Sequence, residues 1–545
     1  MSSEESDNSA SSENEEMFED LLESSDTSDN DESAWTSYAH CKPPFSFTGV
    51  PGFVETFDNE LGAFRHFLTD DIVKRIIEET NRYGCEMKTE ASGRARASNW
   101  ENITHDDFFS FLGLCFLMGI VKKPSISDYW SEDSILSTPI FSKVMPRNRF
   151  QLILSSLHFT NNATADKTDK LYKIREVLTK ILMRFQTYVP DQTLSVDEIL
   201  QKFKGRLYWK QYIPSKRARY GMKVFMVCEA SSSYVYNFIV YTGKDTLSEF
   251  SPSDCEGRLY LPHHMNYFAT KLVLSLVADL KGKGYTVVVD SFFTSLELVK
   301  RLIECKFDIF GTVNKSRKDL PKIFYQSAIE KGEMISSSMF KDEHPISLFR
   351  YSDPKKKTKK TVNMISTIHD SSFVTKTTKT GDCCIPNIIS DYNVTMGGVD
   401  RLAQVIDPYT VVRKSTKWYK KLFFMLMDFL VHNAFVVFAL KRQTQMTKKQ
   451  FQHNLINLLF SSSRSHRSIK SVTGDTPLRL QYRDAHFLRL LPSQKENKST
   501  FRRCVVCTSR SMRKDTKYCC DKCGLVPLCA VPCFETYHTR ASYSN

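Results

Sequence analysis

Apolar residues recur at helical spacing in the first third of the chain, where positions three and four apart would share one face of a helix. The pattern predicts helices over 60–82, 105–121 and 170–187. From Leu194 onward the apolar residues form short runs that are typical of strands. These runs cover residues 194–197, 223–230, 234–241 and 285–290. Helices expected near 267–281 and 295–305 flank the last run, so the middle of the chain predicts a mixed α/β sheet.

The pattern weakens between residues 315 and 385, which are rich in Lys, Ser and Thr and contain a further strand pair near 346–351 and 361–368. This composition indicates an insertion. Helices are expected again at about 397–407, 416–442 and 447–460. The most apolar stretch, residues 422–440, contains Asp428, His432 and Asn433. Because an aspartate near a bilayer centre costs about 2.5–3.5 kcal/mol, we expect a buried helix and no membrane association.

The charge of the chain is strongly asymmetric. Residues 1–33 carry thirteen Asp or Glu and no Lys or Arg, whereas the whole chain has a net charge of +13. Without this segment the net charge rises to +26, which is typical of proteins that bind a polyanion such as DNA. A merely soluble basic protein is the alternative. The acidic segment is poor in apolar residues, so we expect residues 1–42 to form a disordered tail, whose Ser-acid runs suit an acidophilic kinase.

The last forty residues space cysteines and a histidine like ligands of zinc. The candidate ligands are Cys504, Cys507, Cys520, Cys523, Cys529, Cys533 and His538. Each CxxC pair places two thiolates on one turn, and tetrahedral zinc takes four such ligands. We expect one or two structural zinc ions, without Cys519, which directly precedes Cys520. The other cysteines lack framework spacing, which indicates a reducing compartment.

Two aspartates end apolar runs in the middle region, since Asp197 closes LSVD and Asp290 closes YTVVVD. A carboxylate held at the end of a strand can bind Mg²⁺, which takes oxygen ligands. Two such ions about 4 Å apart would activate a nucleophile and stabilise the leaving oxygen in a phosphoryl displacement. Asp400, which follows a Gly-Gly turn, is the candidate for a third acid. On spacing alone, ordinary strand-end aspartates that cap turns are the more common alternative.

Longer motifs extend these observations. The segments LSVDEILQKFKGRL, VVVDSFFTS, SDYNVTMGGVDR and RKSTKWYKKL, followed by the CxxC pairs and PCFETYHT, resemble the piggyBac family of DNA transposases and their domesticated relatives. The resemblance runs from about residue 45 to the end. It implies an RNase H-like catalytic core in which Asp197, Asp290 and Asp400 bind two Mg²⁺ ions. It also implies cut-and-paste transposition at TTAA sites, a homodimer, and binding of terminal inverted repeats by the zinc module.

With this resemblance, the expected fold class is α/β, with a mixed catalytic sheet and flanking helices inserted in a helical domain and followed by a zinc module. The chain then divides into a disordered acidic tail (1–42), a helical DNA-binding and dimerisation region (43–192), an RNase H-like core (193–314), an insertion domain (315–386), the second part of the core (387–409), the second part of the helical region (410–490) and a zinc-binding domain (501–540).

Basic residues near the expected catalytic centre predict contacts to DNA phosphates, which would make binding fall steeply with salt. We assign this role to Lys204, Arg206, Lys216, Arg217, Arg219, Arg413, Lys414, Lys417 and, in the zinc module, Arg503 and Arg513. The alternative for each cluster is a solvated charged face. Trp418 matches a family tryptophan and is a candidate for stacking on a base, against the alternative of a core tryptophan. The run PKKKTKK at 354–360 resembles a nuclear localisation signal, so we expect the nucleus.

One position departs from the family pattern. Family members usually read Gly-Gly-Val-Asp-x-x-Asp, and here Ala403 stands where the second acid is usual, one helical turn after Asp400. Asp407 would lie about 10.5 Å along the helix axis from Asp400, which is too far to replace it. Three hypotheses therefore stand: an active transposase, a domesticated DNA-binding protein with weak or no catalysis, and an inert scaffold whose terminal module is a RING- or PHD-like interaction domain.

Overall fold

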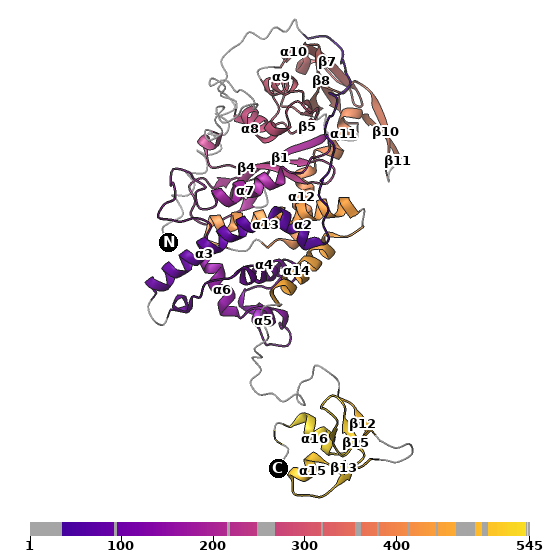
Figure 1. The fold of residues 1–545 in the computed structure, drawn as a ribbon. Helices are drawn as coiled ribbons and strands as arrows, with labels where there is room; N and C mark the ends of the chain where they lie inside the picture. Colours follow the sequence, from indigo (N-terminus) through magenta and orange to yellow (C-terminus); the bar gives the residue numbers. More distant parts are fainter. Residues whose placement is uncertain are drawn as a thin grey trace, which may run out of the picture. The chain divides into compact units, whose positions relative to one another are not determined.

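The computed structural model divides the chain into two compact units, Met1–Ser463 and Arg464–Asn545, and each is described by itself (Figure 1). The structure describes residues 35–91, 95–214, 219–247, 268–317, 320–354, 361–378, 381–411, 415–442, 445–464, 486–492, 500–540 and 542. Several predictions fall on other residues and stay predictions: the first 34 residues of the acidic tail, the lysine run at 355–360, and Lys216, Arg217, Arg413 and Lys414.

The first unit is built on a mixed sheet, in which the structure describes nine strands. They are β1 (Thr193–Lys202), β2 (Gln211–Tyr212), β3 (Tyr220–Glu229), β4 (Val235–Val240), β5 (Thr286–Val289), β6 (Asp308–Thr312), β7 (Met334–Lys341), β8 (His344–Ser352) and β9 (Thr361–Ser366). Their order is β2-β3-β1-β5-β6-β9-β8-β7, and β4 also pairs with β3. Strands β1, β5 and β6 run parallel, whereas the β3–β1 and β4–β3 pairs are antiparallel. The predicted mixed α/β sheet is confirmed.

The sheet separates two hydrophobic cores. Alternate residues of β3 face opposite sides, so Val224 and Met226 join one core and Phe225 and Val227 join the other. Because both faces of β3 and β5 are covered, these strands have the continuous apolar sequence that marked them as strands. Helix α8 (Phe268–Val277) contacts β3 and β4, and α9 (Leu296–Glu304) contacts β6.

The segment expected as an insertion domain does not form a separate body. Strand β9 pairs with β6, so β7, β8 and β9 extend the central sheet, and the short helix α10 (Lys322–Gln326) precedes them. Strands β10 (Phe373–Thr378) and β11 (Gly381–Pro386) pair with each other in a two-stranded ribbon. The strand pair predicted near 346–351 and 361–368 corresponds to β8 and β9, whereas β7, β10 and β11 are rich in polar residues and were not predicted.

Part of the expected acidic tail also lies on the sheet. Thr36 pairs with Ser338 of β7, and Trp35 packs against the sheet core. The sequence analysis expected ordered structure from residue 43 onward, whereas the structure also describes residues 35–42. An edge strand such as β7 offers unpaired backbone N–H and C=O groups, and this polar segment satisfies some of them.

The expected helical region forms the second layer of the first unit (Figure 1). Its helices are α2 (Glu60–Phe67), α3 (Asp70–Glu90), α4 (His105–Ile120), α5 (Ile140–Val144), α6 (Arg147–Ser156), α7 (Arg175–Phe185), α13 (Trp418–Arg442) and α14 (Lys448–Arg464). The helix predicted over 60–82 is in fact two, because Leu68 and the extended Thr69 break the chain between α2 and α3. Helix α4 begins with a capping box between Thr104 and Asp107.

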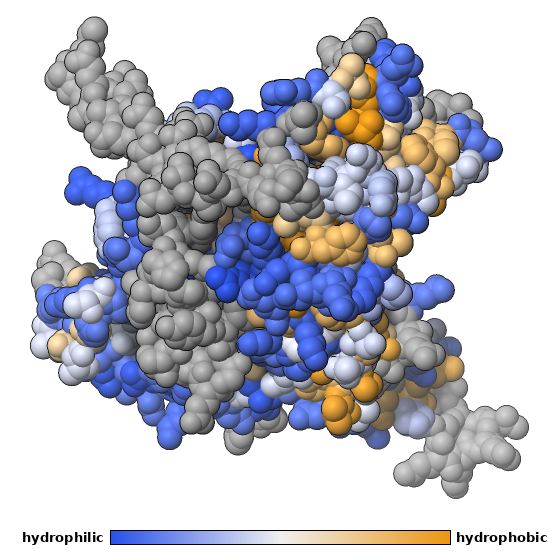
Figure 2. Space-filling model, turned by 90° about the horizontal axis from the view of Figure 1, so that it is seen from above, coloured by the Kyte–Doolittle hydropathy of each residue, from blue (hydrophilic) through white to orange (hydrophobic). Residues whose placement is uncertain are grey.

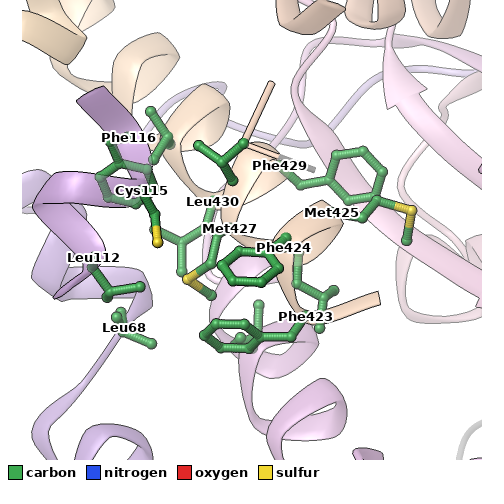
Figure 3. Packing of buried hydrophobic residues seen from close by; sticks show 14 of the residues in the cluster. Leu68, Leu112, Cys115, Phe116, Phe423, Phe424, Met425, Met427, Phe429 and Leu430 are labelled. Carbon is green, nitrogen blue, oxygen red and sulfur yellow. The ribbon is translucent and has the colours of Figure 1, made fainter. Parts of the chain in front are cut away.

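Helix α13 is the centre of the helical layer. Its stretch Trp418–Leu440 is long and apolar enough to cross a membrane by length and composition, yet 83% of its 18-residue apolar window is buried inside the protein. Figure 3 shows its side chains, among them Met427 and Leu430, packed with residues of α4. The Asn433 side chain donates to the Val235 carbonyl of β4 and accepts from the Val235 N–H, both at 2.9 Å. The prediction of a buried helix is therefore confirmed, and its polar residue ties the layer to the sheet.

The second unit is a small module whose core consists largely of cysteines. It contains β12 (Leu488–Leu490), β13 (Arg502–Arg503), α15 (Val505–Ser509), β14 (Asp515–Thr516), β15 (Tyr518–Cys520), β16 (Val526–Pro527) and α16 (Cys533–Thr539). Strand β12 pairs with β15, so the module begins earlier than the predicted boundary at residue 501. So small a core does not stabilise a fold unaided, which is typical of a domain that depends on metal.

Candidate active site and zinc centres

Two of the three candidate aspartates come from neighbouring parallel strands. The last paired residues of β1 and β5 are Val196 and Val289, and Asp197 and Asp290 follow directly. Paired residues of parallel strands project to the same side of a sheet, so these two carboxylates are neighbours. Asp197 does not end its strand as predicted, because β1 continues to Lys202 along β3. Asp197 instead directly follows the last β1 residue that pairs with β5.

The third aspartate, Asp400, lies in the first turn of α12 (Gly398–Ile406), which follows α11 (Asn387–Thr395). The Ser195 hydroxyl of β1 donates to the Met396 carbonyl at 2.6 Å. At Gly398 a Cβ atom would lie 2.9 Å from the Ser195 Cβ atom, so only glycine allows this close approach. Because Ser195 and Asp197 share one face of β1, α12 begins on the face that carries Asp197.

The carboxylate of Asp400 is exposed, whereas those of Asp197 and Asp290 are half-buried. Within the described part of the chain, the groups of three or more ligand atoms that approach within 4.8 Å of one another consist of cysteines and histidines. The three aspartates are thus brought to one face of the sheet without forming a closed cage. All three offer oxygen ligands, the type that Mg²⁺ prefers.

The surroundings of Asp290 disfavour its charged form. Burial raises the pKa of its carboxyl above the ordinary value, and the nearby carboxylate of Glu198 raises it further. The backbone N–H groups of Phe292 and Phe293 donate to Oδ1 at 3.0 and 3.4 Å, and they oppose the shift together with Lys223. Because burial is the main cause of this shift, a cation bound beside Asp290 would favour its ionised form.

Tyr392 of α11 is a residue of this site that the sequence analysis did not single out. Burial raises the pKa of its hydroxyl, and the charges of Asp290 and Asp197 raise it further. The hydroxyl lies 3.4 Å from the Thr312 hydroxyl of β6. Tyr392 belongs to the SDYNVTMGGVDR motif, but tyrosine in a helix is usually a core residue, so only the fold shows that it lies beside the carboxylates.

The described basic candidates differ in their surroundings. Lys204, Arg206, Arg219 and Lys417 are exposed, as contacts to phosphate would require. Figure 2 shows a face of the molecule on which hydrophilic residues predominate and hydrophobic ones form separate patches. Trp418 is half-buried and its ring lies edge-on to Trp209 at 5.5 Å, so it packs against the helical core.

A group of lysines surrounds Lys417. Burial lowers the pKa of Lys420 to about 8, and the charges of Lys417 and Lys173 lower it further. Burial also lowers the pKa of Lys173, helped by Lys417 and Lys167. The ammonium group of Lys420 donates to the carbonyls of Leu154 and Ser155 at 2.8 and 2.7 Å, so it acts within the fold. These mutual effects indicate a strongly positive region around Lys417. Lys173 and Lys167 belong to this region, although the sequence analysis did not name them.

The terminal module holds two clusters of four metal-ligand side chains. One consists of Cys504, Cys507, Cys529 and Cys533, and the other of His486, Cys520, Cys523 and His538. In the first, Cys507 Sγ lies 3.5 Å from Cys533 Sγ and 4.0 Å from Cys529 Sγ. Such spacings suit thiolates around one tetrahedral zinc, with Zn–S bonds of about 2.3 Å. All seven predicted ligands belong to these clusters, and along the chain the two sets interleave.

The eighth ligand, His486, was missed by the sequence analysis. Its Nδ1 lies 3.3 Å from the Sγ atoms of both Cys520 and Cys523, while His538 Nε2 lies 3.5 Å from Cys523 Sγ. The other ring nitrogen of His538, Nδ1, donates to the Phe534 carbonyl at 2.8 Å, which leaves Nε2 for the metal. His486 stands well before the first CxxC pair, and no local spacing marks it.

Cys519 is not a member of either cluster. It lies beside Cys520 in β15, and adjacent residues of a strand project to opposite faces. The basic candidates Arg503 and Arg513 are both exposed. The module thus combines two closed cysteine and histidine sets with a basic surface.

Comparison with known proteins agrees with this architecture. Residues 59–435 match the family model described as Transposase IS4, and residues 486–539 match one described as DDE_Tnp_1-like zinc finger. The human PiggyBac transposable element-derived protein 3 is 26% identical over 486 residues, which cover 87% of this chain and 75% of that protein. This chain belongs to the piggyBac transposase family. The second match begins at His486, the ligand that the structure adds.

Two further relatives support the family assignment. The human PiggyBac transposable element-derived protein 2 is 24% identical over 418 residues, which cover 73% of this chain and 65% of that protein. A piggyBac transposase in a synaptic complex with hairpin DNA, solved by cryo-EM, has a TM-score of 0.66 at 24% sequence identity. The match covers 78% of this chain and 86% of that one. The piggyBac fold therefore extends over most of this chain.

Proposed function

We propose that this chain is a metal-dependent DNA transposase of the cut-and-paste type. The observation that carries the proposal is the alignment of Asp197 and Asp290 on neighbouring parallel strands, with Asp400 delivered to the same face by α12. We further propose that strands β4, β3, β1, β5 and β6, with their mixed directions, are the RNase H-like core expected from the resemblance.

Two Mg²⁺ ions held by Asp197, Asp290 and Asp400 would supply an activated oxygen nucleophile and stabilise the leaving oxygen during in-line displacement at a phosphodiester. The paired strands hold the first two carboxylates rigidly. The contacts of Ser195 and Gly398 hold the start of α12, and thereby Asp400, against β1. Burial of Asp290 keeps bulk water from competing for its carboxylate, which strengthens any electrostatic interaction there.

The remaining parts of the proposal concern DNA and assembly. Exposed Lys204, Arg206, Arg219 and Lys417 are placed to contact phosphates, and the basic zinc module is proposed to bind terminal inverted repeats. The family resemblance favours TTAA target sites, a homodimer that pairs two transposon ends, and action in the nucleus. The known structure of a piggyBac transposase with hairpin DNA supports the DNA-binding part of this proposal.

Excision of a reporter flanked by this element's own ends tests the proposal. The wild type should excise, Asp290→Asn should abolish excision, and Glu86→Gln, which changes an exposed acid of α3, should leave it intact. Binding to the end DNA should be retained in all three proteins. Excision that survives Asp290→Asn would contradict the assigned site.

A second function, DNA binding without efficient cleavage, is favoured by Ala403. This residue lies one turn after Asp400 on α12, where the family usually places a second acid. If the wild type binds the ends but does not excise, Ala403→Asp should restore excision. Restoration would identify a domesticated protein whose catalytic site lost one acid, and the matched change Gln404→Asp, on an exposed position of the same helix, should not restore it.

A further inference from the structure

A pocket of about 680 Å³ in the first unit is lined by two acids, Asp191 and Glu229, that the proposed transposition chemistry does not use. Glu229 ends β3, and Ser232 lies in the turn that follows. The lining also includes Phe53 and, from α13, Leu440. A volume of this size is in the range of about 300–1,000 Å³ that is typical of ligand pockets.

Glu229 is almost fully buried, with only 2% of the residue exposed, and hydrogen bonds hold its carboxylate in place. The Tyr188 hydroxyl donates to its two oxygens at 3.0 and 3.2 Å. The Asp191 backbone N–H donates to Oε1 at 2.6 Å, and the Ser232 hydroxyl donates to Oε2. Three neutral donors thus fix the position of a buried charge without neutralising it.

The two acids form no ion pair with any side chain that the structure describes. Among the described residues, no Lys, Arg or His lies within ion-pair distance of Glu229 or Asp191, in a chain with 75 Lys and Arg. The two acids also act on Tyr285, whose pKa rises to about 12 through burial first and then through the charges of Glu229 and Asp191. Buried charges in proteins are normally paired, so a cation that enters the pocket meets a buried carboxylate in Glu229 and an exposed one in Asp191.

Apolar residues also line or flank the pocket. Leu440 is 52% exposed, and Val50 and Val54, which flank the lining segment 51–53, are 84% and 96% exposed. A long basic side chain matches this arrangement, because its alkyl stem packs on apolar and aromatic surface while its charged end reaches a carboxylate. The acidic floor repels phosphate, so the pocket is not a continuation of the DNA surface.

We infer that this pocket binds the side chain of a lysine or arginine presented by an extended segment of a partner protein. The charged end meets Glu229 and Asp191, and apolar neighbours of the basic residue cover Leu440 and Phe53. A free diamine or guanidine has the same charged group but no apolar flanks, so it gains only the electrostatic part of this interaction.

The test uses the full-length protein and a fluorescein-labelled peptide of sequence Gly-Leu-Arg-Leu-Gly, with citrulline in place of arginine as a neutral isostere. Fluorescence anisotropy should show at least tenfold weaker binding of the citrulline peptide. Asp191→Asn should weaken the arginine peptide about fivefold, as expected for loss of one partly exposed charge pair. Glu229→Gln should weaken it further, and the control Glu132→Gln, an exposed acid outside the pocket, should have no effect.

Agmatine as a competitor separates the two sources of a guanidinium group. It should displace the peptide only at concentrations at least tenfold higher than the unlabelled peptide requires, because it lacks the apolar flanks. Equal potency of agmatine would overturn the assignment to a protein segment. Equal binding of the arginine and citrulline peptides, or unchanged affinity in Asp191→Asn, would overturn the cation site itself. Thermal unfolding of each variant shows whether a lost signal comes from misfolding.

Discussion

Replacing His486 by alanine tests the interleaved zinc assignment. Two clusters of four ligands predict two zinc ions per chain. The Nδ1 atom of His486 lies 3.3 Å from the Sγ atoms of Cys520 and Cys523. The substitution removes this ligand from the second cluster and leaves the four cysteines of the first cluster unchanged.

The expected loss of affinity follows from the ligand count. A structural site with four ligands binds Zn²⁺ with a free energy of about 10–16 kcal/mol at neutral pH. An equal share for each ligand is about 2.5–4 kcal/mol, which corresponds to a zinc affinity about 100- to 1,000-fold weaker at the second site. In the presence of a competing chelator, the His486→Ala protein should therefore keep one zinc ion per chain while the wild type keeps two.

Zinc content is measured by elemental analysis after dialysis against a chelator, and affinity by competition with a colorimetric zinc indicator. Two variants serve as controls. Cys519→Ser changes a buried cysteine next to a ligand, and His453→Ala changes an exposed histidine of α14; both should keep two ions. Unchanged affinity in His486→Ala, or loss of one ion in Cys519→Ser, would refute the assignment.

Three further predictions concern the fold and the catalytic face. Asn433→Ala leaves the buried N–H and C=O of Val235 unpaired. Urea denaturation should therefore show a loss of about 2–5 kcal/mol in the free energy of unfolding. The control Asn457→Ala, on an exposed position of α14, should cost under about 0.5 kcal/mol. Burial lowers the pKa of His432 to about 3; the folded protein keeps it neutral while the unfolded chain takes up a proton below about pH 6.5, so stability falls as the pH falls from 6.5 towards 3. Between pH 7 and 5, His432→Gln should lose about 2 kcal/mol less stability than the wild type, and parallel pH profiles would contradict this. Tyr392→Phe should slow strand cleavage about two- to tenfold, as for one lost hydrogen bond, without weakening DNA binding. An unchanged cleavage rate would show that the Tyr392 hydroxyl has no role in catalysis.

Signals that are local along the chain could be predicted well. The apolar runs of β3, β4 and β5 marked strands because both faces of this part of the sheet are buried. Four of the seven predicted zinc ligands form two CxxC pairs, each on one turn, and Cys529, Cys533 and His538 follow close behind them in the sequence. The position of Asp290 directly after β5 could be predicted because an apolar run precedes it. In each case the residues that define the feature are close in sequence.

Features that depend on pairing between distant segments were decided by the tertiary structure. β1 continues beyond Asp197 because residues as far as Lys202 pair with β3, although they are too polar to read as an apolar strand. Strands β7, β8 and β9 join the sheet through the pairing of β9 with β6. His486 joins the second ligand cluster when β12 pairs with β15 and brings it to Cys520.

The acidic pocket belongs to the same class. Glu229, Asp191 and Leu440 come from three separate segments, and each is unremarkable in its local sequence. By itself the sequence determined which segments form helices and strands and which residues can hold metal, because side-chain periodicity and ligand spacing act over a few residues. The tertiary structure decided which of those residues meet, because hydrogen bonds and charges act between any groups that folding brings within a few ångströms.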